Sequence, residues 1–398
     1  MVRKKTDFSL LLFIILVSIL MALMMQSVVY LYISDTYNPN YYIYQILLYC
    51  LAGVVVVKNR RRIHAGRIVF LMWAFGAICF LFSFVQLEVF NSRIIGALFF
   101  NSFIIPLAFL NGSWLGDRLS NLKDRDIYLL LLQLPAFYSM YLLYSYNALG
   151  NWFDADAAFC VIVFFPFVFF FKREWLSIVL AVFYTAFALT SAKRSILILV
   201  VVCIVFFTIY LFKSKRPSPK LAINRLLLIL AVAVGSLFIL TNESSGLIHT
   251  QERIEMFGGI TFDNGRYKIY GAVSSAFFNS SIPHFLFGHG DNAVKRDFNI
   301  GAHNDLLEIG YDFGVIAALL YITILAVLLS KSWNYSKHSI HSSAMRSGIC
   351  ITSIIILGML NCIITSTVLE YIMFLAMGCA MGLKESQSLQ NQLYSNVK

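Results

Sequence analysis

Long, uninterrupted apolar runs dominate the chain and alternate with short polar segments. A membrane-spanning helix needs about 20 apolar residues, and on that scale the pattern predicts about twelve spans. They cover residues 8–32, 41–57, 68–87, 94–110, 127–146, 156–171, 175–190, 195–212, 224–241, 304–330, 347–365 and 369–383. Continuous runs disfavour an outer-membrane barrel, whose strands alternate apolar and polar residues. We therefore expect an all-α polytopic membrane protein, with residues 1–398 forming a single integral membrane domain.

The longest polar stretch, residues 242–303, lies between the ninth and tenth predicted spans and predicts one large loop within that domain. It contains four of the seven histidines, His249, His284, His289 and His303. Residues 266–282 have the apolar spacing of a short amphipathic helix, with Phe277 among the side chains expected to face the membrane. The segment 283–290, which contains Pro and Gly, predicts a turn-rich connection.

Composition excludes two broad classes of protein. The chain is 59% hydrophobic and 13% charged, whereas soluble domains average about 45–50% apolar and about 25% charged residues. A soluble globular enzyme and a disordered chain are both excluded, because neither accommodates so much apolar surface. The seven cysteines lie inside apolar runs without a CxxC spacing, which indicates neither a disulfide framework nor a zinc site.

The basic residues indicate the orientation of the chain. A net charge of +11 could suggest nucleic acid, but these residues lie between apolar runs, as in membrane loops. Cytoplasmic loops are enriched in Lys and Arg, and a cytoplasmic N-terminus puts 23 of the 31 basic residues on that side. We therefore expect both termini to be cytoplasmic, the large loop to face the other side, and no nucleic-acid partner.

Residues 301–314, with the sequence GAHNDLLEIGYDFG, give the strongest chemical signal and continue into the tenth predicted span. Asn304 or Asp305 is expected to cap this helix at its N-terminus, which puts His303 at the mouth of the helix. Two interpretations of this histidine stay open. It is either a capping or hydrogen-bonded loop residue, or a general base.

The same helix carries a stripe of acids. Asp305, Glu308 and Asp312 are three and four residues apart, so they share one helix face. Carboxylates at membrane depth are costly unless they face a wet cavity, so the stripe predicts a polar chamber. Gly310 and Gly314 form a pair of small residues that predicts close approach of another helix.

Cations on the predicted outer side are the candidate anion-binding groups. Arg194, preceded by Lys193, lies in a tight turn between the seventh and eighth spans and could bind a phosphate with its planar guanidinium. The alternative is that the short sixth and seventh spans are miscounted and the pair is a cytoplasmic anchor.

Arg266 and Lys268 open the predicted amphipathic helix of the large loop and could also bind an anion, or form a solvated face against lipid headgroups. Arg93 is either a further phosphate contact or the ion-pair partner of Glu88 at the outer surface. No metal site is expected.

The His303 segment resembles the O-antigen ligase/polymerase superfamily of bacterial envelope proteins. That family has His-Asn, nine residues, then Gly-x-x-Gly/Thr/Tyr in its large periplasmic loop. Here His303-Asn304 is followed by nine residues and Gly314, but Ala317 takes the last position. This departure weakens the match to the ligase branch in particular.

Three further features are similar to the family's pattern. They are Gly265-Arg266 early in the loop, Pro283 with Gly288-His289-Gly290 before the histidine, and the turn from Ser191 to Arg194. The resemblance implies a metal-independent, GT-C-like glycosyltransferase that uses undecaprenyl-diphosphate-linked sugars without a cofactor. It places the protein in lipopolysaccharide biosynthesis, as a multi-pass protein of the inner membrane with a periplasmic active site.

These expectations converge on an O-antigen polymerase, in which the growing glycan moves from undecaprenyl diphosphate onto a lipid-linked repeat unit. His303 is the expected base, Asp305 or Glu308 the carboxylate that orients it, and Arg194 and Arg266 the diphosphate clamp, with Lys193, Lys268 and Arg93 secondary. The expected partners are the lipid-linked donor and acceptor, membrane lipids and a chain-length regulator. Two alternatives stay open, a ligase acting on lipid A core and a lipid-linked oligosaccharide flippase.

Overall fold

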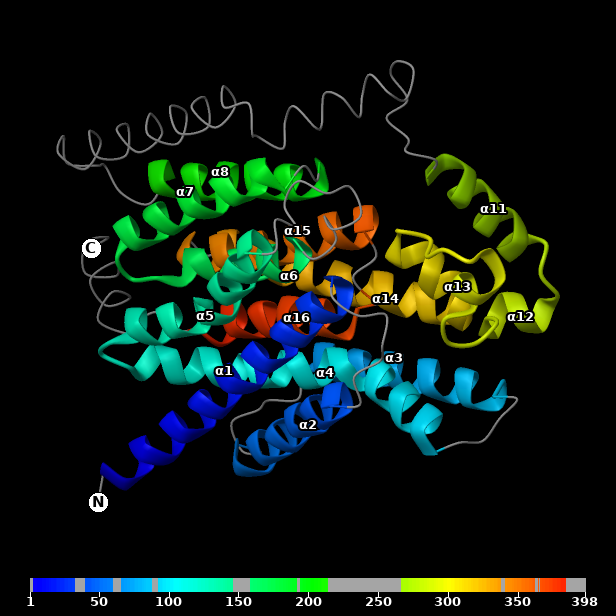
Figure 1. Ribbon diagram of the computed structural model, residues 1–398, viewed down its shortest axis with the longest axis horizontal. Coiled ribbons are helices and arrows are strands. Elements are labelled where there is room, and N and C mark those ends of the chain that lie inside the picture. Colours follow the sequence, from blue (N-terminus) through cyan, green and yellow to red (C-terminus); the bar gives the residue numbers. More distant parts are fainter. Residues whose placement is uncertain are drawn as a thin grey trace, which may run out of the picture.

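The computed structural model describes residues 3–32, 40–59, 66–87, 92–145, 158–191, 194–213, 266–337, 341–361, 364 and 366–383 (Figure 1). Within these ranges the regular elements are all helices. They are α1 (Arg3–Tyr32), α2 (Asn40–Asn59), α3 (Arg67–Val85), α4 (Ser92–Asn121), α5 (Arg125–Ser145), α6 (Ala158–Ile162), the 3₁₀ helix η3 (Phe165–Phe170), α7 (Glu174–Thr190), α8 (Arg194–Lys213), α11 (Arg266–Phe278), α12 (Ile282–Phe287), α13 (Ala293–Phe298), α14 (Asp305–Lys337), α15 (His341–Asn361) and α16 (Thr367–Gly382).

Five helical segments of the described chain are long and apolar enough to cross a membrane: Arg67–Val85, Ile95–Asn121, Arg125–Ser145, Asp305–Lys337 and Ser342–Asn361. Shorter apolar segments coincide with six other predicted spans. The ninth predicted span, 224–241, lies outside the described residues, as do residues 242–265 of the large loop. The all-helical membrane class is thus supported, and the count of twelve spans stays a prediction.

The sixth predicted span is not one continuous helix. Residues 156–171 were expected to form it, but the structure has the five-residue α6, a turn at 163–164, and the six-residue η3. Pro166 explains the break, because it has no N–H to donate to the carbonyl of Ile162 and its ring crowds that carbonyl. Both short helices are buried among their neighbours.

The tightest helix pair is α4 against α16, which run parallel and begin at the same end of the bundle. Thr367 Oγ1 donates to Asn101 Oδ1 at 3.1 Å near that end, which links the two helices. Farther along, a Cβ on Gly112 would collide with the Leu375 carbonyl, and one on Gly378 with the Phe109 carbonyl. Small residues on both helices therefore set the separation of this pair.

Contacts along α8, α14 and α15 show which helix ends lie together. Cys203 of α8 contacts Ser353 of α15, and Phe206 contacts Gly348, so these two helices run antiparallel. Since Asn304, just before α14, bonds the Met359 carbonyl at 3.4 Å, α14 begins where α15 ends. The starts of α8 and α14 therefore lie at the same end of the bundle.

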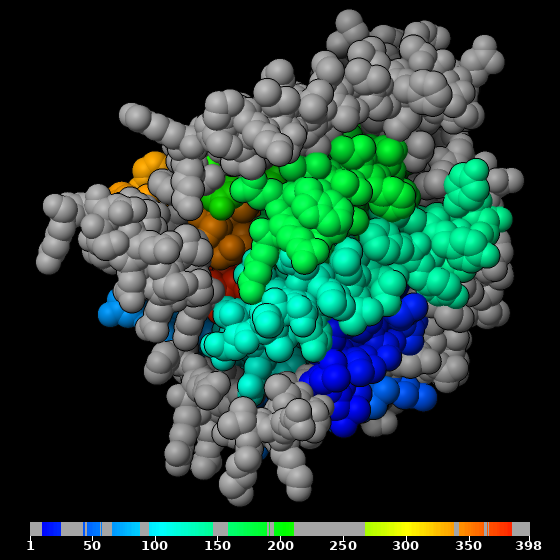
Figure 2. Space-filling model, turned by 90° about the vertical axis from the view of Figure 1, so that its left-hand side faces the viewer, coloured from blue at the N-terminus to red at the C-terminus, as the bar shows by residue number. Residues whose placement is uncertain are grey.

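Helices α11, α12 and α13 gather beside the start of α14, at the right in Figure 1. A small apolar core joins them to α14, formed by Val273, Ala293, Val294, Ala302 and Tyr311. The opposite end of the molecule faces the viewer in Figure 2, where parts of α1, α5 and the α7–α8 pair can be seen. Large apolar side chains on the helices point outward, among them Phe70 and Val85, as lipid contact requires.

Candidate active site

The chain enters α14 through a constrained turn that carries His303. Asn304 caps the helix, since its Oδ1 accepts from the N–H groups of Leu306 at 3.0 Å and Leu307 at 3.2 Å. His303 has a φ of 53°, in the left-handed region, and its carbonyl accepts from the Tyr270 hydroxyl at 3.3 Å. The backbone of the expected base is thus fixed by the cap on one side and by α11 on the other.

Two of the three acids on the α14 stripe each hold a segment that precedes the helix. Glu308 Oε2 accepts from the Ala302 N–H at 2.6 Å, and Asp312 Oδ1 accepts from the Val294 N–H at 2.9 Å. The Glu308 bond fixes the residue immediately before His303. This acid therefore acts on the position of the histidine through the backbone.

Asp305 is almost fully buried and bonds in another direction. Its Oδ1 accepts from the Ile364 N–H at 3.1 Å and its Oδ2 from the Tyr321 hydroxyl at 2.9 Å. It thereby connects the start of α14 to the segment between α15 and α16. The expected polar chamber exists, but Glu308 and Asp312 line it whereas Asp305 does not.

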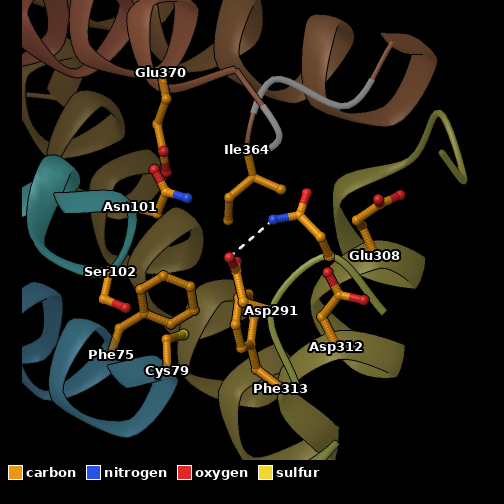
Figure 3. Close-up of a pocket in the computed structure, with 11 residues that line it drawn as sticks. Phe75, Cys79, Asn101, Ser102, Asp291, Glu308, Asp312, Phe313, Ile364 and Glu370 are labelled. Atoms are coloured by element: carbon orange, nitrogen blue, oxygen red, sulfur yellow. Dashed lines mark hydrogen bonds between the residues drawn. The ribbon is translucent and has the colours of Figure 1, made fainter. Parts of the chain in front are cut away.

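Four carboxylates converge on this pocket from three parts of the chain (Figure 3). Asp291 comes from the turn before α13, Glu308 and Asp312 from α14, and Glu370 from α16. The pocket holds about 470 Å³ of empty space, part of it open to solvent. The rest of its lining is Phe75, Cys79, Asn101, Ser102, Asn292, Phe313 and Ile364. Burial raises the pKa of Asp291, which favours its neutral form.

A kink in α14 joins this helix to the loop at 288–290. Gly314 has φ 84° and ψ 172°, so the helix is interrupted there. The carbonyls of Tyr311 and Asp312 accept from the N–H groups of His289 at 2.9 Å and Gly290 at 2.8 Å. The interruption thus presents two backbone acceptors to the loop that carries Asp291 into the pocket.

Two expectations for this region are wrong and one is confirmed. Residues 282–287 form the helix α12 instead of a turn-rich connection, and Pro283 lies in its first turn, where its missing N–H costs nothing. Gly310 and Gly314 do admit other helices, since Phe277 of α11 packs over Gly310 and the α12 backbone lies against Gly314, whose positive φ also kinks α14. Phe277 does not face the membrane but packs over Gly310 and against the core beneath α11.

Three rings stack beside the kink. The His284 and His289 ring centroids lie 4.5 Å apart at 6°, and those of His289 and Tyr311 lie 4.3 Å apart at 14°. The Tyr311 hydroxyl donates to Asp297 Oδ2 at 2.9 Å, and Arg296 Nε donates to Asp297 Oδ1 at 2.8 Å. Burial and the neighbouring His284 lower the pKa of His289.

The expected cations of the described chain lie in the first turns of three helices, α4, α8 and α11. Arg194 begins α8, and Arg266 begins α11 one turn before Tyr270, which bonds the His303 carbonyl. Lys268 is exposed. Arg93 is the second residue of α4, two turns before the pocket residues Asn101 and Ser102, whereas Lys193 lies outside the described residues.

Sequence reasoning missed Asp291, Glu370 and Ser102 as pocket residues. Glu370 carried a usable signal, because it is a single acid within an apolar run and such residues are costly in a membrane. Asp291 and Ser102 carried none, since a loop aspartate and a helical serine are ordinary features. Only the packing of α4 against α16, and the return of the 288–292 segment onto α14, bring them to the pocket.

Comparison with known proteins finds a match to one protein-family model. Residues 176–322 match the family model described as O-antigen ligase. The match covers α7, α8, the segment containing α11 to α13, and the first half of α14. It confirms the resemblance to the O-antigen ligase/polymerase superfamily. No curated protein matches the chain.

Proposed function

Because residues 176–322 carry the pattern of the O-antigen ligase family, we propose that this membrane protein is an O-antigen polymerase. It transfers a growing glycan from undecaprenyl diphosphate onto the end of a lipid-linked repeat unit, at the periplasmic face of the inner membrane. The observation that carries the proposal is the fixed turn of His303 at one end of the bundle, where α8, α11 and α14 all begin.

The reaction needs one base and one clamp. An acceptor hydroxyl attacks the anomeric carbon of the donor, its proton passes to the His303 imidazole, and the glycosyl–oxygen bond to the diphosphate breaks. The electron pair leaves with the diphosphate, which Arg194 and Arg266 neutralise, assisted by Lys193, Lys268 and Arg93. Glu308 positions His303 through the Ala302 N–H, and Asp305 secures the start of α14.

The donor needs no further acid, because a neutralised diphosphate is already a good leaving group. The protein therefore works as a metal-independent, GT-C-like glycosyltransferase without a cofactor. A chain-length regulator is the proposed protein partner. Two helices, α3 and α15, finish at the end of the bundle where α4, α8, α14 and α16 begin. This alternation agrees with cytoplasmic termini and an active site at the periplasmic end.

Acceptor exchange tests the function directly. Purified protein in lipid nanodiscs, given the lipid-linked repeat unit as both donor and acceptor, should produce longer lipid-linked chains. Product formed on lipid A core instead would make the chain a ligase. The His303→Ala variant should lose elongation, whereas intact elongation with lipid-linked units accumulating on the cytoplasmic side would favour a flippase.

Labelling tests the orientation. A cysteine at exposed Lys295 should react with a membrane-impermeant maleimide from the periplasm. One at exposed Lys123, in the turn between α4 and α5, should react only after lysis. The reverse pattern would place His303 on the cytoplasmic side and end the proposal.

A further inference from the structure

The proposed reaction uses His303 and the cations but leaves most of the acidic pocket without a role. Asp291, Asp312 and Glu370 reach it from the turn before α13, from α14 and from α16 (Figure 3). None of the residues that line it within the described chain is a Lys, Arg or His. A diphosphate would meet only like charge here, so this pocket is not the diphosphate clamp.

A buried hydroxyl in the pocket points to a ligand. Ser102 is 5% exposed, and its Oγ has no hydrogen-bond partner among the residues that the structure describes. Two other buried helical serines, Ser139 and Ser353, bond the carbonyl four residues earlier at 2.8 and 2.7 Å, whereas Ser83 of α3, outside the pocket, shares the unpaired state of Ser102 within the described chain. A buried polar group without a partner is unfavourable, so a ligand that bonds Ser102 Oγ would complete the site.

The lining selects an uncharged, hydroxyl-rich ligand. Four carboxyl groups in one desolvated pocket cannot all be ionised, so some are neutral and can both donate and accept. Together with Asn101 and Ser102 they match the paired donor and acceptor character of sugar hydroxyls, while Phe75 and Phe313 add apolar faces. A metal ion fits less well, because no three His, Cys, Asp or Glu side chains of the described chain are grouped closely enough to hold one.

The pocket adjoins the proposed base. Glu308 lines the pocket and also bonds the N–H of Ala302, the residue before His303. We infer that the pocket lined by Asn101, Ser102, Asp291, Asp312 and Glu370 binds a sugar of the acceptor repeat unit, so that the hydroxyl to be glycosylated extends out of the pocket towards His303. This inference rests on the proposed function and assigns its two substrates to separate regions, the acceptor sugar to the acidic pocket and the donor diphosphate to the cations.

The variants Ser102→Ala and Glu370→Gln test the assignment, because each removes one hydrogen-bonding partner or charge with little change of shape. The matched control is Ser83→Ala, in which a buried serine of α3, also without a partner for its Oγ, lies outside the pocket. In nanodiscs, KM for acceptor and for donor is measured with each varied separately. Binding without turnover is measured with the lipid-free repeat-unit oligosaccharide, released by mild acid from lipid-linked units of the same cells.

The two pocket variants should raise the acceptor KM and the oligosaccharide Kd about three- to tenfold, as loss of one hydrogen bond does. The donor KM should stay unchanged in both variants. The Ser83→Ala variant should keep the wild-type acceptor KM, donor KM and oligosaccharide Kd. A rise in donor KM instead, or unchanged oligosaccharide binding, would overturn the pocket while leaving the polymerase proposal standing. Binding of Mg²⁺ alone that Glu370→Gln abolishes would make it a cation site and also overturn it.

The converse outcome separates the two proposals. If the wild-type protein elongates nothing, yet binds the oligosaccharide and loses that binding in Ser102→Ala, the sugar pocket stands and the polymerase function falls.

Discussion

Gly288 and Gly314 lie on opposite sides of the junction between α12 and α14, and each packs against the backbone of the other's helix. A Cβ on Gly288 would collide with the Asp312 carbonyl, and one on Gly314 with the Leu286 carbonyl, and both residues have a positive φ. The two glycines thus permit the contact that lets His289 and Gly290 bond the carbonyls freed by the kink. This contact holds Asp291 at the acidic pocket.

Substituting Gly314 by Ala should loosen this junction. A backbone with φ 84° and ψ 172° is almost restricted to glycine and costs Ala about 1–3 kcal/mol. The collision with Leu286 adds to this cost, so we expect a lower unfolding temperature and at least tenfold lower elongation. The control is Gly271→Ala in α11, where a Cβ meets nothing within 4 Å. Thermal unfolding in detergent measures stability, and equal midpoints for the two variants would contradict the role of the kink.

The α4–α16 contact gives a second test of packing. Gly112→Ala places a methyl group against the Leu375 backbone, which cannot move without separating the two helices. We expect a stability loss of about 1–3 kcal/mol, the usual cost of overpacking, measured as a lower unfolding midpoint. Gly53→Ala in α2 is the control, since its Cβ would enter open space, and an unchanged midpoint in Gly112→Ala would refute the close contact.

The sequence predicted much of this fold, because long apolar runs and the Asn304 cap are local signals. The motif glycines were also visible, but only part of their purpose was. Gly314 was expected to admit another helix, and α12 does pack against it, but the kink is seen only in its backbone angles. Glu308 and Asp312 could be placed on one face by spacing alone. Their partners, the N–H groups of Ala302 and Val294, depend on how the loop folds back and have no counterpart in a local pattern.

Acidification should destabilise the loop that carries the ring stack. The pKa of His289 is lowered below the usual histidine value of 6.5, first by burial and then by His284, with Arg296 acting the same way and Asp297 opposing. The unfolded chain therefore binds the proton more readily, so stability rises with pH across the interval below 6.5. We expect the unfolding midpoint to fall between pH 7 and pH 5.

Replacing His289 by Phe keeps a ring in the stack but removes the titration, so it should reduce this pH dependence. The unfolding midpoint measured from pH 5 to pH 8 in both proteins checks the sign. If wild type and His289→Phe lose stability equally on acidification, another group is responsible. His284→Gln should also weaken the dependence, since it removes the neighbouring positive charge that opposes protonation of His289.

The clamp predicts a difference between two cations of equal charge. Arg194→Lys at the start of α8 keeps the positive charge but loses the planar fork that binds two phosphate oxygens at once. We expect elongation to fall about ten- to a hundredfold, the range that a charge-assisted hydrogen bond of about 1.5–3 kcal/mol gives, with the donor KM rising and the acceptor KM unchanged. Arg173→Lys is the matched control. Arg173 precedes the start of α7, whereas Arg194 follows its end, and the Arg173 side chain is largely exposed beside Asp126. Near-normal turnover in Arg194→Lys would remove this residue from the clamp and leave Arg266 as the principal candidate for the diphosphate.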